Sequence, residues 1–152
     1  MKITFIGHGS LSNCPNLLSE ITGAIMENAS KNEKTLFYCG GYGDFDNLCA
    51  KACSSLKNIL TCEVIYVTPY ITQSQQEKIH YLIDSKLYDS TLYPPLENVP
   101  YKFAISKRNE WMINESDLII AFVKRNHGGA YKSLAYAKRK KKKIINLGEA
   151  NL

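Results

Sequence analysis

The stretch "FYCGGYGDFDN", from Phe37 to Asn47, holds three glycines between an apolar run and a helical pattern. Gly40, Gly41 and Gly43 do not have the G-x-G-x-x-G spacing of a dehydrogenase-type dinucleotide site. A buried strand, a glycine turn and a helix, in that order, nevertheless form the repeating unit of a parallel α/β sheet. The stretch therefore predicts one strand–turn–helix unit, and the rest of the chain continues the same pattern.

Five apolar runs are short, β-branched and not alternating, which is typical of strands buried on both faces: Ile3–Ile6, Leu36–Cys39, Val64–Val67, Leu118–Val123 and Ile144–Leu147. Helical patterns lie between most of them, beginning near Leu17, Phe45, Ala104 and Tyr131. This alternation predicts an α/β fold, a Rossmann-like three-layer sandwich. We expect a mainly parallel five-stranded sheet with the order 3-2-1-4-5.

The chain of 152 residues predicts a single domain, residues 1–152. One segment, from about 69 to 100, departs from the pattern. It contains one helical pattern near Ser74–Ile83 and then "YDSTLYPPLENVP", which is rich in tyrosine and proline. Long irregular segments are usually lids or binding loops, so we expect a lid-like segment here.

The composition, with 45% hydrophobic and 22% charged residues, is that of a soluble globular protein. No apolar stretch is long enough to cross a membrane, and "MKITFIGHGS" lacks the apolar region of a secretory signal, so we expect none. Five cysteines without that signal predict a reducing, cytoplasmic setting. Cys49 and Cys53 share a helix face but have no CxxC or histidine partner, so we expect buried thiols and no metal or other cofactor.

The net charge of +5 is unevenly placed, because "KRKKKK" (Lys138–Lys143) alone supplies six positive charges. Such a run can be a solvated helix end, where cations suit the helix dipole, or a contact for nucleic acid or an acidic partner. The rest of the chain is nearly neutral, and no aromatic residues interleave with the run. Those two observations favour the solvated helix end.

Ligands of open α/β sheets bind beyond the carboxyl ends of the strands, where the strand order reverses. The loops after the first and fourth predicted strands flank that point, and the loop after the second lies beside it. All three carry glycines: Gly7-His8-Gly9-Ser10, His127-Gly128-Gly129-Ala130 and Gly40-Gly41-Tyr42-Gly43. Small residues and helix N-termini suit a close anionic ligand, so these loops predict a phosphate-bearing small molecule.

Three titratable residues in these loops are candidates for chemistry. His8 can act as a general acid or a phosphate donor, or be a loop histidine held by the backbone. Asp44 is interpreted first as the helix cap and otherwise as a catalytic carboxylate. Asp46, two residues further on, suits a ribose hydroxyl or proton transfer at a glycosidic bond.

A further candidate pair opens the helix before the fourth strand. Arg108, if aimed at the crevice, can clamp a phosphate through two nitrogens, and Asn109 follows it. Trp111 is the only tryptophan, and we interpret it as core packing rather than as a base-stacking platform.

The stretch "RNEWMINESDLIIAFVKRNHGGAYKSLAYAKRKKKKIINL" (108–147) resembles the C-terminal half of the SLOG superfamily. This superfamily includes the YpsA-like proteins, the DprA DNA-processing fold and the LOG phosphoribohydrolases. "FIGHGS" resembles the "TGHR" start of YpsA-like members, and "FYCGGYGDFDNLCA" their glycine-rich turn and helix. The likeness covers nearly the whole chain except Pro69–Pro100, and it implies a nucleotide or nucleotide-derived ligand at the crevice.

The resemblance fails where LOG enzymes carry their catalytic carboxylates. These enzymes cleave the N-glycosidic bond of nucleoside monophosphates, with an "R-K-x-x-M" run and a "P-G-G-x-G-T-x-E-E" loop. Arg108, Met112 and the pair Gly128-Gly129 match those motifs, but the two glutamates would fall at Leu134 and Ala135. His127, Tyr131 and Lys132 replace the proline and the Gly-Thr, and Ser10 stands where YpsA-like members have arginine. LOG-type catalysis is therefore not expected unless Asp44 or Asp46 substitutes.

Three functional hypotheses follow, and the sequence leaves them open. The leading one is a YpsA-like protein that binds a nucleotide or nucleotide-derived ligand, as a sensor or to sequester it. The alternative is an N-glycosidic hydrolase or deoxyribosyltransferase that uses Asp44 or Asp46. The third is DprA-like nucleic-acid binding through Lys138–Lys143. A homo-oligomer formed through the helices also stays open, because a parallel sheet leaves two free edges.

Overall fold

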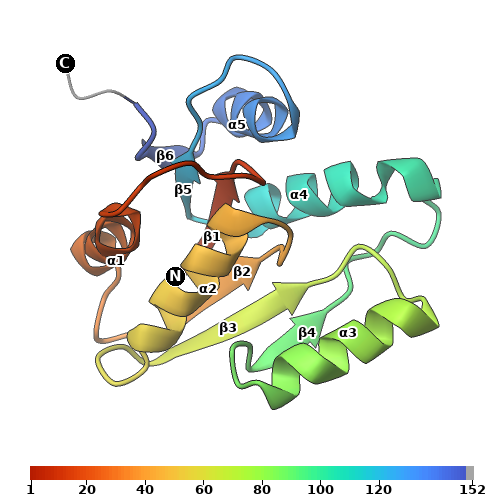
Figure 1. Ribbon diagram of the computed structural model, residues 1–152, viewed down its shortest axis with the longest axis horizontal. Coiled ribbons are helices and arrows are strands. Elements are labelled where there is room, and N and C mark those ends of the chain that lie inside the picture. Colours follow the sequence, from red (N-terminus) through yellow and green to blue (C-terminus); the bar gives the residue numbers. More distant parts are fainter. Residues whose placement is uncertain (150–152) are drawn as a thin grey trace.

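The structure is a computed structural model that describes residues 1–149. It contains one sheet of six strands in the order β4-β3-β2-β1-β5-β6, and all five strand pairs are parallel. The strands are β1 (Lys2–Gly7), β2 (Thr35–Cys39), β3 (Cys62–Val67), β4 (Ser90–Leu92), β5 (Leu118–Phe122) and β6 (Lys143–Asn146). The helices are α1 (Leu17–Asn28), α2 (Asp44–Ser55), α3 (Gln73–Asp84), the 3-10 helix η1 (Tyr101–Phe103), α4 (Ala104–Glu115) and α5 (Gly129–Arg139) (Figure 1).

The predicted α/β class is confirmed, and the five predicted strands occur in the predicted order, but the prediction missed the sixth strand. β4 lies inside the segment expected to be irregular and pairs with β3 at the edge of the sheet. It has only three residues and none is buried, so it leaves no apolar run in the sequence. Helix α3 precedes it where a helical pattern was expected, and it also buries no residue completely.

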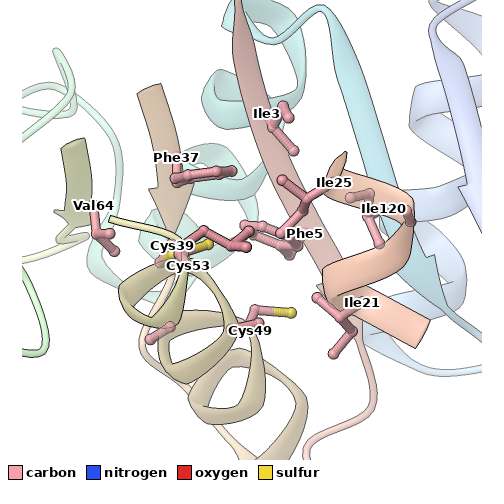
Figure 2. Close-up of a cluster of buried hydrophobic side chains, with 14 of the residues drawn as sticks. Ile3, Phe5, Ile21, Ile25, Phe37, Cys39, Cys49, Cys53, Val64 and Ile120 are labelled. Carbon is pink, nitrogen blue, oxygen red and sulfur yellow. The ribbon is translucent and has the colours of Figure 1, made fainter. Parts of the chain in front are cut away.

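Two sets of helices cover the two faces of the sheet, and successive side chains of each strand point alternately towards one set and the other. Phe5 and Phe37 point into a core shared with α1 and α2, and Figure 2 shows them with Ile21, Ile25 and the α2 cysteines. Their neighbours Ile6 and Tyr38 point to the opposite face, where α5 and α4 cover them. Trp111 of α4 packs edge-on against Tyr38 at 5.4 Å, which agrees with the predicted core role.

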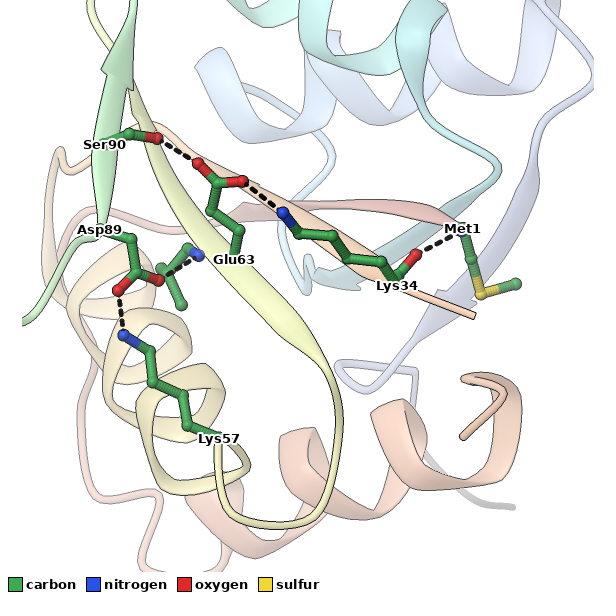
Figure 3. A network of polar contacts seen from close by, with 7 residues as sticks. Met1, Lys34, Lys57, Glu63, Asp89 and Ser90 are labelled. Atoms are coloured by element: carbon green, nitrogen blue, oxygen red, sulfur yellow. Dashed lines mark hydrogen bonds and ion pairs between the residues drawn. The ribbon is translucent and has the colours of Figure 1, made fainter. Parts of the chain in front are cut away.

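A polar network holds the short edge strand in register (Figure 3). The Val64 N–H donates to the Asp89 carboxylate at 2.8 Å, and the Asp89 N–H donates back to the Val64 carbonyl at 2.8 Å. Lys57 pairs with the same carboxylate, and Glu63 of β3 accepts from Ser90 of β4 at 2.7 Å. These bonds fix the register of β4 against β3, which the short, unburied sequence of β4 does not determine by itself.

The cysteines and the lysine run both have structural roles. Burial raises the pKa of the Cys49 and Cys53 thiols, which lie in the core beside Cys39. Within residues 1–149 no group of three potential metal ligands occurs.

The run Lys138–Lys143 ends α5 and enters β6, whose first residue pairs with Leu118, the first residue of β5. The run therefore lies at the end of the sheet where the parallel strands begin, opposite their carboxyl ends. No helix in the described part of the chain is long and apolar enough to cross a membrane.

Candidate functional site

A cavity of about 470 Å³ lies between α4 and α5 at the carboxyl end of β1. β1 and β5 are neighbours there, and their chains continue into helices on opposite faces, so this is the point where the strand order reverses. Twelve of the sixteen residues predicted for the site line the cavity: Gly7, His8, Gly9, Ser10, Tyr42, Asp46, Arg108, Asn109, His127, Gly128, Gly129 and Ala130.

The glycines of the turn after β2 pack against protein instead of lining the cavity. A Cβ on Gly40 would lie 3.2 Å from the Arg108 guanidinium and 3.2 Å from the Asp46 carboxylate. Gly41 packs on the ring of Tyr66. Gly43 has a φ of 106°, and a Cβ there would lie 2.6 Å from the Cα of Gly9. The turn thus needs glycine so that it can approach Arg108 and the loop after β1.

Asp44 does not cap α2, so that interpretation was wrong. Gly43 is the N-cap residue and Asp44 is the first residue of the helix. The Asp44 N–H donates to the Gly9 carbonyl, and its carboxylate accepts from the Leu11 N–H, both at 2.9 Å. Asp44 therefore fixes the loop after β1 to the start of α2, and it does not line the cavity.

Asp46 is the carboxylate that lines the cavity. It accepts from the Tyr42 N–H at 2.9 Å. Burial raises its pKa from 3.8 to about 6, against the lowering effects of that N–H and of Arg108. A carboxyl group that titrates near neutral pH can both donate and accept a proton there, which is what general acid–base chemistry requires.

Arg108 is buried and tied to protein acceptors. Its Nη1 donates to the carbonyls of Gly40 at 3.0 Å and Val67 at 2.8 Å, and its Nε donates to Asn109 Oδ1 at 2.9 Å. These bonds join the ends of β2 and β3 to α4. Because Nη1 and Nε are occupied, only Nη2 is left for a ligand, and the predicted two-nitrogen phosphate clamp does not fit. The residue also lies in the second turn of α4, not at its start as predicted.

His8 joins the loops after β1 and β5. It is 8% exposed, and its Nε2 accepts from the Lys124 N–H at 3.0 Å. That bond requires a neutral ring with its proton on Nδ1. Burial lowers the pKa of His8 first, followed by the charges of Arg125, His127 and Lys124. The structure thus gives His8 the backbone-held role, and it places the positive charges of Arg125 and Lys124 near it.

The mouth of the cavity is suited to an anion. Arg125 and His127 line it and are exposed. Gly128, with a φ of 92°, precedes α5, and a Cβ on it would meet nothing within 4 Å. First-turn N–H groups of a helix have no partners within the helix, so Gly129 and Ala130 offer donors at the positive end of its dipole. Sequence reasoning missed Arg125, although it lies between an apolar run and a glycine pair.

The interior of the cavity combines an apolar surface with the charged groups of Arg108 and Asp46. Ile105, Met112 and Ile113 of α4 line it together with Ile6 of β1. None of these four residues was among those predicted for the site. A site with an apolar surface inside and a cationic mouth matches a ligand that has a flat ring at one end and a negative charge at the other.

A second cavity, of about 590 Å³, lies on the other face of the sheet beside the start of α1. Cys14, Glu20 and Glu149 line it, together with Lys124. Two carboxylates make it a poorer match for an anion than the first cavity, and none of the residues predicted for the site lines it.

No family model matches the sequence, and no curated protein matches it. Solved structures do resemble the fold. DNA processing protein A from Helicobacter pylori, which binds single-stranded DNA, aligns with a TM-score of 0.61 and 17% identity over 99% of this chain and 68% of that one. Its counterpart from Streptococcus pneumoniae gives 0.65 and 15% over 99% and 51%. The Moco carrier protein of Chlamydomonas rheinhardtii gives 0.53 and 16% over 97% and 75%. At these identities the likenesses show that the chain has the Rossmann-like fold of DNA processing protein A.

Proposed function

We propose that the protein binds a nucleotide or nucleotide-derived small ligand in the cavity between α4 and α5, as a sensor or sequestering protein of the YpsA-like SLOG type. One observation carries the proposal: three loops from neighbouring strands surround a single cavity whose mouth is cationic and whose interior has an apolar surface on α4. The phosphate would lie near Arg125, His127 and the start of α5. The base would lie against Ile105, Met112 and Ile113.

The size of the cavity supports a small ligand. Its volume of about 470 Å³ falls within the range of about 300–1,000 Å³ that is usual for ligand sites. A neutral His8 is consistent with this proposal, because Arg125 supplies the positive charge that an anionic ligand would need. His8 instead holds the loop that carries Arg125 and His127 through its bond to the Lys124 N–H.

Isothermal titration with nucleoside monophosphates, ADP-ribose and cyclic nucleotides tests the proposal. We expect one of these classes to bind, and Arg125→Ala to weaken that binding about tenfold, since a charge-assisted hydrogen bond is lost. Arg139→Ala is the matched control, because it removes the same charge at the opposite edge of the sheet, where the ring of Tyr136 lies under it. Absence of binding to every nucleotide class, or equal effects of the two variants, would contradict the proposal.

An N-glycosidic hydrolase or transferase is the second candidate, and the raised pKa of Asp46 favours it. In such an enzyme Asp46 would exchange a proton with the leaving base or orient the ribose, while the LOG-type glutamates are replaced by Leu134 and Ala135 of α5. If the reaction occurs, Asp46→Asn should abolish turnover of the bound nucleotide and leave its affinity nearly unchanged. Full turnover by the variant would remove this candidate.

Nucleic-acid binding through Lys138–Lys143 has weaker support. Lys142 already donates to the Asn114 and Ser116 carbonyls, and Lys143 to Asn28, so part of the run has structural partners. Contacts between lysines and phosphates release counterions, so this mode predicts affinity that falls steeply with salt. Binding that persists at high salt would exclude it.

A further inference from the structure

We infer that three tyrosines beside the cavity, Tyr42, Tyr70 and Tyr101, form a stacking subsite for a second base, so that the ligand is a dinucleotide or a longer single strand. This inference rests on the proposed function and extends it from a mononucleotide to a ligand with two rings. Tyr42 comes from the loop after β2, Tyr70 from the loop after β3, and Tyr101 from the 3-10 helix η1 before α4. We refer to them below as the tyrosine subsite.

The subsite presents an open aromatic face in a defined orientation. The rings of Tyr70 and Tyr101 stack with centroids 4.6 Å apart and planes 18° apart. Tyr101 is nevertheless 70% exposed, so one face of its ring is covered by Tyr70 and the other faces solvent. A flat ring held on one side and free on the other matches the geometry on which nucleobases stack in single-strand binding proteins.

Hydrogen bonds hold the backbone segments that carry the two stacked rings. The Thr68 hydroxyl donates to the Tyr70 carbonyl at 2.9 Å and receives a bond from Gln75 Nε2 at 3.0 Å. Tyr101 begins the 3-10 helix that leads directly into α4. Arg108 joins the two segments, because it lies on α4 and donates to the Val67 carbonyl just before the Tyr70 loop.

The subsite is continuous with the cavity. Tyr42 is 66% exposed and lines the cavity. Arg108 lines the same cavity and donates to the Val67 carbonyl, three residues before Tyr70, at 2.8 Å, and Tyr101 opens the 3-10 helix that leads into α4. A ligand whose first base occupies the apolar interior can therefore continue past Tyr42 and place its next base on Tyr101.

The charges of this rim suit a phosphodiester between the two bases. Lys102 follows Tyr101, is exposed, and places its Nζ 5.1 Å from the ring centre of Phe103. Arg108 is buried and lines the adjoining cavity, with Nη2 free of protein hydrogen bonds in the described residues. An anionic linker with aromatic rings on both sides complements this arrangement of cation and tyrosines.

The test compares adenosine monophosphate, a phosphorylated adenosine dinucleotide and a short single-stranded oligonucleotide by isothermal titration. We expect Tyr101→Ala to weaken the affinity for the dinucleotide by about fivefold or more and to leave the affinity for the monophosphate within about twofold of the wild-type value. Tyr101→Phe, which keeps the ring, should bind all three as the wild type does. Tyr81→Ala is the matched control, since Tyr81 is 74% exposed on α3 and lies outside the subsite. If the oligonucleotide binds more tightly than the dinucleotide, the strand continues beyond Tyr101. If the two bind equally, the ligand is the dinucleotide.

Other results would overturn the inference. Equal loss of monophosphate and dinucleotide affinity in Tyr101→Ala would mean that the tyrosines belong to the mononucleotide site. If the wild type sediments as a dimer and Tyr101→Ala as a monomer, while the dinucleotide affinity is unchanged, a second copy of the chain covers the tyrosines. Monophosphate binding in the wild type that is as tight as dinucleotide binding would refute the second-base subsite alone. Absence of binding to any of the three would refute the proposed function.

Discussion

At the residue scale, the glycine turn after β2 controls how closely two loops approach. Gly43 combines a φ of 106° with a Cβ position only 2.6 Å from the backbone of Gly9. The Asp44 N–H donates to the Gly9 carbonyl across the same contact at 2.9 Å. The glycines that first suggested a ligand cradle therefore act indirectly, because they set the position of the loop that lines the cavity.

Gly43→Ala tests this role. The added methyl group meets backbone, and the conformation is strained for any L-residue, so we expect a loss of about 2 kcal/mol or more of unfolding free energy. Gly9→Ala is the control from the same contact, because a Cβ on Gly9 meets nothing within 4 Å. Urea denaturation should show a change of less than about 0.5 kcal/mol for this control. Similar stabilities for both variants would contradict the packing described here.

Asp46 is the residue whose charge the fold disfavours. Its pKa is about 6 in the folded protein, against 3.8 for a free aspartate, so the folded state holds the proton more tightly than the unfolded state does. The stability contribution of this proton is complete below pH 3.8 and is lost as the pH rises through 6. The ionised side chain then lowers the stability by about 3 kcal/mol.

Asp46→Asn should therefore be more stable than the wild type at about pH 8, with the difference shrinking towards zero near pH 4. The amide oxygen can still accept from the Tyr42 N–H, so packing is preserved. Urea midpoints of the two proteins across this pH range measure the difference directly, and the titration of His8 cancels because both proteins contain it. A variant that loses stability relative to the wild type as the pH rises would contradict the raised pKa.

At the element scale, α4 is the part that organises the site. It carries Arg108, supplies the apolar interior through Ile105, Met112 and Ile113, and follows directly from Tyr101. Lys142 of the lysine run holds the C-terminal end of α4. Its Nζ donates to the carbonyls of Asn114 at 2.9 Å and Ser116 at 3.0 Å. Carbonyls at the end of a helix have no partners within it, so this lysine satisfies two of them.

Lys142→Ala should lower the unfolding free energy by about 1 kcal/mol through the loss of these two bonds. Lys138→Ala removes the same charge from the exposed last turn of α5 and should cost less than about 0.5 kcal/mol. Thermal unfolding of both variants provides the comparison. If the two substitutions have equal effects, the run acts only through its total charge.

The elements that the sequence predicts well are those with a strong apolar pattern. β1, β2, β3 and β5 and the helices α1, α2, α4 and α5 each bury a recognisable set of side chains, and β6 packs Ile144 and Ile145 partly buried against the core. β4 and the true role of Asp44 could not be predicted, because both depend on contacts across the sheet: Asp89 with Val64, and Asp44 with Leu11. The three-loop edge of the site was predictable from glycine positions. The apolar interior, the engagement of Arg108 and the stacked pair of Tyr70 and Tyr101 depend on tertiary packing that no local pattern reveals.

At the scale of the whole molecule, the two charged features lie at opposite ends of the parallel sheet. The cavity and the tyrosine subsite lie at the carboxyl ends of the strands, and Lys138–Lys143 lies at the amino-terminal edge beside Leu118. The second cavity opens on the α1 face of the sheet. These separate places make the location of a ligand a direct test of the account.

A nucleotide titration followed by the backbone amide NMR signals of the full chain is the measurement that tests the central claim most directly. With adenosine monophosphate, we expect the largest shifts at His8 to Ser10, at Gly128 to Ala130 and in the first two turns of α4. Residues 138–143 and the residues around Glu20 on the α1 face serve as internal controls and should not move. Shifts concentrated in either control region, or none at saturating nucleotide, would contradict a nucleotide site between α4 and α5.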